Sequence, residues 1–230
     1  MSNTMGAGEV AESIRAMGTI PSIDEVHAQG FDFYPRHWLD RWPRDNYAIP
    51  PVLSLDGLDD RGRRYLNRSD LFRLGQDVQT PTDALNFFVA VYAWGVGNKA
   101  RGVGRGVRVL EDGTASDRIF AALTALRESH FDPRTGYEAF HFKAQSRLKY
   151  LGPAFFTKLL YFYSHDRAIS STNLPLILDQ RVAHSVGFRS TSWWTPDEYA
   201  VYIDLIDRVR INLDSDVPCD VIEYLLFQAG

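Results

Sequence analysis

The sequence predicts an all-α, or mainly α-helical, protein. From residue 67 onward, apolar residues recur at the spacing of amphipathic helices, and several of these stretches begin with capping residues. Alternating strand patterns are weak, and the best of them is "GVRVLE" at 106–111. A chain of 230 residues can bury one large core or form two closely packed lobes.

The predicted elements divide the chain into two parts. Residues 18–66 are rich in Pro, Gly, Asp and aromatic residues, and we expect a short helix around 35–41 with loop on either side. Further helices are predicted at 80–95, 115–129, 135–150, 195–213 and 217–228. Residues 1–66 are therefore interpreted as a loop-rich segment that packs on a helical domain formed by residues 67–230.

The ends of two predicted helices carry clear signals. Thr80 and Pro81 open the first of them, and Gly95 is a typical stop. Thr195 and Glu198 have the spacing of a capping box. These positions fix where the helices at 80–95 and 195–213 begin.

Composition excludes several classes of protein. No run of apolar residues approaches the length of a membrane span, and the N-terminus lacks the basic start and apolar run of a secretory signal. The single cysteine, Cys219, excludes an internal disulfide and any four-cysteine zinc or iron–sulfur site. A reducing cytoplasm is the expected compartment.

Positive charge is concentrated locally although the net charge is −4. Residues 97–110 carry four basic residues and no acid, and 141–189 carry seven basic residues against two acids, whereas 190–230 are acidic. A polyanion responds to the local field, so a basic face on an acidic protein can bind DNA. The alternative is that these charges are scattered and solvated.

The glycine-rich stretch "WGVGNKARGVGRGVRVL" at 94–110 lacks the preceding strand and the G-K-[ST] of a nucleotide-binding loop. One interpretation is a flexible basic loop that approaches a DNA backbone through Lys99, Arg101 and Arg105. The other is a solvated connector between two helices.

The stretch "LGPAFFTKLLYFY" at 151–163 contains Lys158, one of only four lysines among 25 basic residues. On a helical wheel, most of the apolar side chains fill one side, while Lys158 falls on the opposite side with Thr157, Tyr161 and His165. Taken alone, that position favours a solvated lysine.

The residues that flank this helix suggest a site. Gly152 and Pro153 mark a tight turn and a new helix, whose first backbone N–H groups can hold a phosphate. Further along, the apolar run "NLPLIL" ends at Asp179, ahead of another predicted helix, "QRVAHSVGF". Capping that helix would by itself account for Asp179.

The order helix, glycine turn, lysine-bearing helix, loop and terminal aspartate resembles the helix-hairpin-helix DNA glycosylases. "LGPAFFTKLLYF" is most similar to a subgroup of bacterial proteins with an 8-oxoguanine DNA glycosylase fold. The resemblance covers residues 134–190. It implies a two-lobed helical fold with the hairpin near 148–153.

Three positions depart from the pattern of this family. Tyr150 stands where the family's hairpin usually has its first glycine, and Gly152 matches the second. The usual lysine position falls on Ala154, so Lys158 lies one helical turn, about 5.4 Å, further along the same face. Ile-Leu replaces the usual Pro-Val before Asp179.

The resemblance implies a DNA glycosylase with AP-lyase activity that excises an oxidised purine such as 8-oxoguanine. Lys158 would attack the sugar and form a Schiff base, and Asp179 would stabilise the sugar cation and assist proton transfer. Gly152, Ala154 and Lys149 would contact the DNA backbone.

The aromatic residues expected to hold an extruded base are Phe155, Phe162, Trp94, Trp193 and Trp194. Each of them has an alternative place in the hydrophobic core. The implied partner is double-stranded DNA with a damaged or modified base, bound by a monomer in the nucleoid. No cofactor and no metal site are expected.

Two alternatives remain open at this point. The first is a glycosylase for another modified base, including the modified bases of invading DNA. The second is a non-catalytic helix-hairpin-helix module that binds DNA but has lost the base pocket.

Overall fold

The protein is described by a computed structural model, which covers residues 5–165, 173–213 and 216–230. Within these residues it contains twelve α-helices, one short 3-10 helix and one two-stranded sheet. The predicted all-α class is therefore confirmed. The elements in the first part of the chain are α1 (Ala7–Ala16), α2 (Ile23–His27), β1 (Gly30–Phe33), α3 (Pro35–Leu39), η1 (Pro51–Leu53), β2 (Arg64–Asn67) and α4 (Arg68–Gln76).

The remaining elements are all helices: α5 (Pro81–Val96), α6 (Ala100–Val109), α7 (Ala115–Glu128), α8 (Pro133–Phe140), α9 (Pro153–Ser164), α10 (Gln180–Ser185), α11 (Pro196–Leu213) and α12 (Cys219–Ala229). The predicted capping signals operate as expected. Thr80 and Asp83 form a capping box before α5, and Thr195 and Glu198 exchange the corresponding hydrogen bonds before α11.

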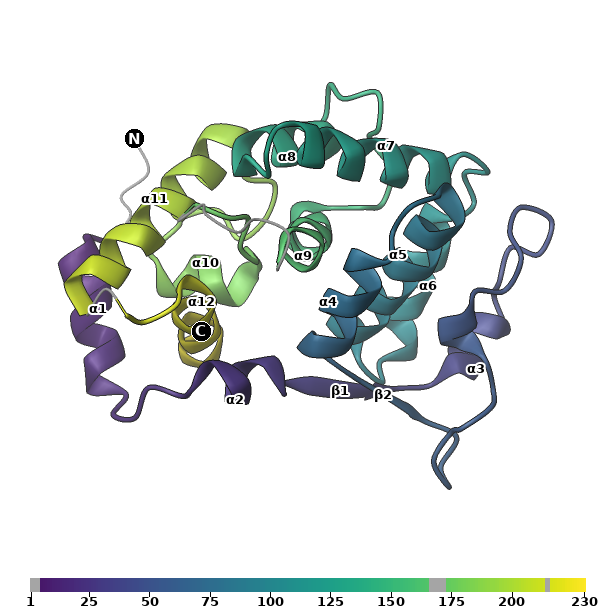
Figure 1. Cartoon of the computed structure of the whole chain (residues 1–230), viewed down its shortest axis with the longest axis horizontal. Coiled ribbons are helices and arrows are strands. Elements are labelled where there is room, and N and C mark those ends of the chain that lie inside the picture. Colours follow the sequence, from purple (N-terminus) through teal and green to yellow (C-terminus); the bar gives the residue numbers. More distant parts are fainter. Residues whose placement is uncertain (1–4, 166–172, 214–215) are drawn as a thin grey trace.

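The helices form two groups with α9 between them (Figure 1). One group contains α1, α10, α11 and α12, and the other contains α4, α5, α6 and α7. Helix α8 packs against α7, α9 and α11 and so joins the groups along one edge. Along the opposite edge, α2 contacts both α12 and α4, and the antiparallel β1–β2 pair follows α2.

Helix α9 is the central element, because every residue from Phe156 to Ser164 is buried. It contacts α4, α5, α7 and α8. The crossing with α4 is close at Gly75, where an added Cβ would lie 2.6 Å from the carbonyl oxygen of Phe162. A glycine is needed there because any side chain would force the two helices apart.

Three sequence expectations differ from the structure. The segment 18–66 contains α2, η1 and two strands in addition to the predicted short helix. "GVRVLE", the best strand candidate, lies mostly within α6. The helix expected over 135–150 ends at Phe140, so residues 141–152 connect α8 to α9 without continuous helix.

A buried ion pair crosses the centre of the protein. Arg68, the first residue of α4, places its Nη1 2.8 Å from Oε2 of Glu223 on α12, and both side chains are only 1% exposed. The same guanidinium donates to the hydroxyl of Tyr161 on α9 and to the side chain of Gln29. Arg68 therefore connects α4, α9, α12 and the residue before β1.

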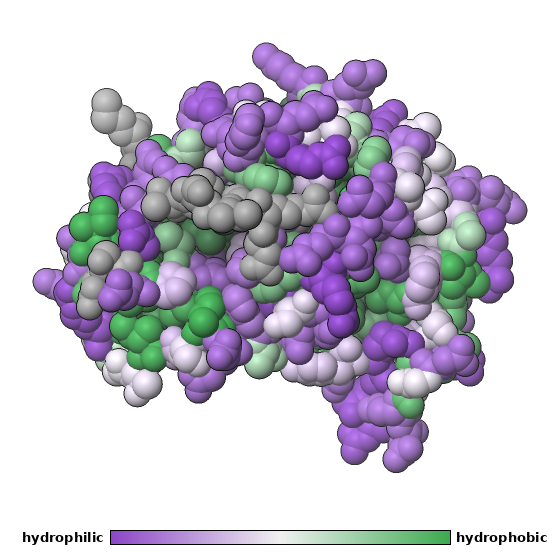
Figure 2. Space-filling model, viewed as in Figure 1, coloured by the Kyte–Doolittle hydropathy of each residue, from purple (hydrophilic) through white to green (hydrophobic). Residues whose placement is uncertain are grey.

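The surface is mainly hydrophilic on the face shown in Figure 2, with smaller apolar areas between charged residues. Among the described helices, none is both long enough and apolar enough to cross a membrane.

We expect Arg68→Ala to destabilise the protein strongly, because Glu223 would keep a buried charge without its partner. Losing one member of a buried pair costs about 3–5 kcal/mol, which lowers the Tm of a protein of this size by about 6–20 °C. Thermal unfolding followed by circular dichroism measures the change.

The matched control is Arg73→Ala, which removes an exposed pair with Asp70 on the same helix. It should change the free energy of unfolding by less than about 1 kcal/mol. Equal Tm values for the two variants would show that the buried pair does not organise the fold.

Candidate active site

Lys158 is buried and makes two polar contacts. Its side chain is 8% exposed, and Nζ lies 3.2 Å from Oδ2 of Asp179 and 2.9 Å from the carbonyl oxygen of Ala154, one turn earlier in α9. The expectation of a solvated lysine is wrong. The face of α9 opposite its main apolar stripe is also buried. The helical wheel therefore distinguished two buried faces of the helix, not a buried face from a solvent-exposed one.

Asp179 has two structural tasks at once. Its Oδ1 accepts hydrogen bonds from the backbone N–H groups of Arg181 and Val182, which confirms the predicted N-cap of α10. Its Oδ2 contacts Lys158. The capping interpretation and the interpretation as a partner of the lysine are therefore compatible, because each uses a different oxygen.

The charge state of Asp179 follows from these contacts. Burial would raise the pKa of this carboxyl, but the Lys158 ammonium and the N–H groups of Val182 and Arg181 more than offset that effect. The net pKa lies below its ordinary value, so Asp179 is a carboxylate at neutral pH. A negative charge is thus fixed beside the lysine.

The apolar run before Asp179 is anchored by hydroxyl groups. Thr157 Oγ1 accepts from the N–H of Leu178 at 3.2 Å, so the run lies along α9. From α11, Tyr199 bonds both backbone groups of Leu176, and Tyr202 donates to the carbonyl of Ile177. Asp179 is therefore held by a backbone segment with few unsatisfied groups.

Lys158 and Asp179 line a cavity of about 400 Å³. Three aromatic side chains line it as well: Phe31 from β1, Trp94 from α5 and Phe227 from α12. Phe31 and Trp94 meet edge to face, with ring centroids 5.3 Å apart. The cavity has the size of a small-molecule site and combines aromatic walls with a fixed ion pair.

The buried pair of Arg68 and Glu223 lies on the wall of the same cavity. Burial raises the pKa of Glu223, and the guanidinium of Arg68 opposes this. Gln29, which accepts from Arg68, also lines the cavity. Two ion pairs therefore contribute hydrogen-bonding groups to one aromatic cavity.

Gly95 makes room for the lysine. A Cβ at this position would lie 2.9 Å from the ring of Phe155 and 3.4 Å from Cδ of Lys158. The sequence marked Gly95 as a helix stop, but α5 continues to Val96. Its structural effect is to leave space on α5 where the lysine side chain passes.

The comparison with protein families is decisive at this point. Residues 24–227 match the family described as "Putative 8-oxoguanine DNA glycosylase OGG-like protein". The chain belongs to this family. No curated protein and no solved structure showed a match.

The match includes every element that lines the cavity of this OGG-like protein, from β1 to α12. It extends well beyond residues 134–190, where the sequence itself showed the resemblance. The family assignment therefore rests on residues 24–227 as a whole rather than on the segment around Lys158.

Among the aromatic residues predicted to hold a base, only Trp94 lines the cavity. Phe155 stacks on Tyr92, with ring centroids 3.9 Å apart, and Phe162 is fully buried behind Trp94. For these two residues, the alternative place in the core is the one that the structure shows.

The two adjacent tryptophans also lie outside the cavity lining. Trp194 is buried, and its indole donates to the carbonyl of Ser190. Trp193 is 53% exposed, has a left-handed backbone and stacks on the exposed ring of Phe142. Neither tryptophan is therefore retained as a wall of the base pocket.

Most of the basic segment 97–110 forms helix α6, so neither a flexible loop nor a solvated connector describes it. Arg101, Arg105 and Arg108 are exposed on α6 at spacings of four and three, which places them on one face. Val103 and Val107 are buried on the other face. Lys99, just before α6, lines the cavity.

The predicted hairpin meets the arginine face of α6. Tyr150, at the position of the family's first hairpin glycine, adopts a left-handed φ of 72°. Its hydroxyl accepts from Arg108 at 2.7 Å, and Lys149 lies 5.0 Å from its ring centroid. Gly152 is the N-cap of α9, whereas the carbonyl of Ala154 holds Lys158.

The sequence analysis missed Phe31, Phe227, Gln29 and the pair of Arg68 and Glu223. A signal existed only for Phe31, which lies in the aromatic-rich segment 18–66. The others come from helix ends or from α12 and show no distinctive spacing. Of the charged residues in 141–189, Asp166 and Arg167 lie outside the described residues.

Proposed function

We propose that this OGG-like protein is a DNA glycosylase with AP-lyase activity that excises an oxidised purine, 8-oxoguanine first, from duplex DNA. The observation that carries the proposal is the contact between Lys158 and Asp179 at the wall of the aromatic cavity. A primary amine, a carboxylate and a pocket for a planar base are the three parts that this chemistry requires.

The first step joins the enzyme to the sugar. Lys158 gives one proton to Asp179, and the neutral amine bonds to C1′ of the nucleotide. The bond between C1′ and the base breaks, and its electron pair leaves with the base, which takes up the proton from Asp179. As Asp179 passes this proton to the base it becomes a carboxylate again, and its negative charge stabilises the positive charge that develops on the sugar.

The second step opens the sugar and cleaves the strand. A proton moves from the amine to O4′ as the ring opens, which leaves a Schiff base between C1′ and Lys158. Transfer of a proton from C2′ to the Asp179 carboxylate then expels the 3′ phosphate. Hydrolysis of the remaining imine with water regenerates the lysine.

The base would enter the cavity after extrusion from the duplex. Such enzymes hold an extruded base by stacking and by hydrogen bonds to its edge. Phe31, Trp94 and Phe227 offer aromatic surface, and Gln29 offers hydrogen-bonding groups at the wall. A purine with an added oxygen fits this mixture of apolar and polar walls.

The DNA backbone would lie along the arginine face of α6 and the turn before α9. Arg101, Arg105, Lys149 and Lys99 are exposed, and the segment 97–110 that contains three of them carries no acid. The N-terminus of α9, capped by Gly152, supplies backbone N–H groups for a phosphate. Arg108 and Tyr150 link these two surfaces.

The aromatic cavity and the ion pair on its wall count against the non-catalytic alternative. Burying a lysine and a carboxylate has a desolvation cost that a module without a pocket would not need. A different modified base remains the second candidate, since the same chemistry serves any base that the cavity admits.

We expect sodium borohydride to trap a covalent complex between the protein and duplex DNA that contains 8-oxoguanine. Lys158→Gln should abolish this adduct, because an amide cannot form a Schiff base. Lys143→Gln, which changes an exposed lysine outside the cavity, is the control and should give the parental yield. Denaturing gels measure the adduct, and an undiminished adduct with Lys158→Gln would exclude this residue as the nucleophile.

We expect Asp179→Asn to reduce base release by at least about 100-fold, because a neutral amide cannot stabilise the sugar cation. Asn remains a good N-cap, so α10 should keep its start. Single-turnover kinetics measures release without interference from slow product dissociation. Circular dichroism at the assay temperature controls for folding, and parental release by a folded variant would leave Asp179 as a cap only.

We expect affinity for undamaged duplex DNA to fall steeply with salt, with a log–log slope of about −0.9 per phosphate contact. Arg105→Ala should make the slope shallower by about 0.9. Arg208→Ala, an exposed change on α11 in the acidic region, should not alter it. Fluorescence anisotropy over a salt series provides the test, and identical slopes for the two variants would remove α6 from the DNA interface.

A further inference from the structure

Two histidines and one aspartate meet on the far side of Tyr161 from Arg68. His27 ends α2, His165 is the C-cap of α9, and Asp220 lies in the first turn of α12. One side-chain donor atom from each residue lies within 4.8 Å of the other two. His27 Nε2 and Asp220 Oδ2 are 3.1 Å apart.

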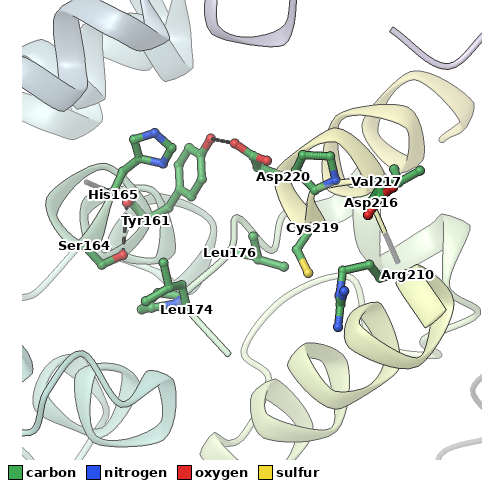
Figure 3. Close-up of a pocket in the computed structure, with 12 residues that line it drawn as sticks. Tyr161, Ser164, His165, Leu174, Leu176, Arg210, Asp216, Val217, Cys219 and Asp220 are labelled. Carbon is green, nitrogen blue, oxygen red and sulfur yellow. Dashed lines mark hydrogen bonds between the residues drawn. The ribbon is translucent and has the colours of Figure 1, made fainter. Parts of the chain in front are cut away.

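This cluster sits in a structured environment rather than on an open surface. The ring of His165 stacks on Phe72 with centroids 3.6 Å apart, and His27 meets both rings edge to face. The side chain of Asp220 is 10% exposed. The hydroxyl of Tyr161 donates to Oδ2 of Asp220 at 3.2 Å, which fixes the orientation of that carboxylate (Figure 3).

A second cavity, of about 320 Å³, adjoins the cluster. His165, Asp220 and Tyr161 line it, and Figure 3 shows these side chains on one side of the space. It is distinct from the cavity that contains Lys158, since the residues that line the two cavities do not overlap. A water molecule or a small anion has room next to the three side chains.

We propose that His27, His165 and Asp220 bind one Zn²⁺ ion, with a water molecule from this second cavity as the fourth ligand. Zn²⁺ bonds imidazole nitrogen and carboxylate oxygen at about 2.0–2.2 Å in tetrahedral sites, so its donors lie about 3.3 Å from one another. The pair formed by His27 and Asp220 already has this spacing. The third donor requires a shift of about 1.5 Å or less to reach the same geometry.

The ligand types select the class of metal. Two imidazoles and one carboxylate suit zinc and its neighbours, whereas Mg²⁺ and Ca²⁺ require mainly oxygen ligands. An ion pair between His27 and Asp220 alone would need only one imidazole. The second imidazole comes from a different helix and places a further nitrogen donor within 4.8 Å of the other two donor atoms.

The metal would cross-link α2, α9 and α12, which lie around the candidate active site. His165 lies two turns after Lys158 on α9, and Asp220 lies one turn before Glu223 on α12. The site would therefore hold the C-terminal end of α9 against the N-terminal end of α12, next to α2. This inference does not depend on the proposed glycosylase function.

The test begins with the full-length protein after dialysis against a chelator. Zn²⁺ is then titrated by calorimetry, and the metal that remains after desalting is measured by mass spectrometry. We expect one Zn²⁺ per chain and, at 100 times the Kd, a Tm rise of about 5–10 °C. Mg²⁺ at the same concentration should leave the Tm unchanged. Absence of bound zinc, or zinc that binds without raising the Tm, would overturn the proposal.

Variants locate the metal. His165→Ala should weaken zinc affinity by at least about 100-fold and abolish the zinc-dependent rise in Tm, whatever the Tm in chelator. Asp220→Asn keeps an acceptor for Tyr161 and should lose the same increment, which separates metal binding from the hydrogen bond. His184→Gln, an exposed histidine on α10, is the control and should keep the full rise. The same increment in all three variants would place the zinc elsewhere and refute the site.

The metal readouts separate this proposal from the function proposed above. Zinc binding without base release would leave the metal site standing and remove the glycosylase. Base release in a protein that binds no zinc would support the glycosylase and refute the metal site.

Discussion

The ion pair between Arg68 and Glu223 is the interaction on which the rest of the structure depends. It lies where α4, α9 and α12 converge, and neither partner has access to solvent. Because an uncompensated charge in this interior is strongly unfavourable, a packing of α4 and α12 that separated Arg68 from Glu223 would be penalised. The pair thus contributes specificity to an interior that is otherwise built from interchangeable apolar contacts.

The same pair shapes the cavity that contains Lys158. The two ion pairs on its wall, Lys158 with Asp179 and Arg68 with Glu223, are each neutral as a pair, and Asp32, Lys99 and Arg181 line the same cavity. Each carboxylate has its own cation, so Asp179 stays ionised while Glu223 is held by Arg68. A neutral base can enter such a cavity without a large change in electrostatic energy. In the proposed reaction, the negative charge of Asp179 would stabilise the sugar cation.

The sequence predicted those parts of the fold that local chemistry determines. The start of α5 follows from Thr80 and Asp83, and the start of α10 follows from Asp179, since each cap bonds to N–H groups within its own first turn. The strand candidate at 106–111 lies in a helix because its alternating valines also fall at helical spacing with Val103. The packing of that valine face against the core favoured the helix. The predicted helix at 135–150 failed after Phe140, where α8 ends at His141.

The same limit applies to the candidate site. A helical wheel assumes that one face of the helix is exposed to water, but α9 lies at the centre of the protein. The exposure of Lys158 therefore could not be predicted from its position on the wheel. Lys158 and Asp179 could be found because they are close in sequence and ordered as in a known pattern. Phe31 and Phe227 come from opposite ends of the chain, and only the tertiary structure brings them to one cavity.

Asp179 shows why stability and chemistry are coupled in this protein. One oxygen of its carboxylate starts α10, and the other holds the lysine, so a single side chain both ends the apolar run 176–178 and orients the amine. The backbone of that run is fixed by Thr157 from α9 and by two tyrosines from α11. A displacement of α11 against α9 would therefore strain the run between its tyrosine and threonine anchors, and with it the contact between Asp179 and Lys158. The geometry of the ion pair consequently depends on how the two groups of helices pack, although both of its members lie within one short stretch of sequence.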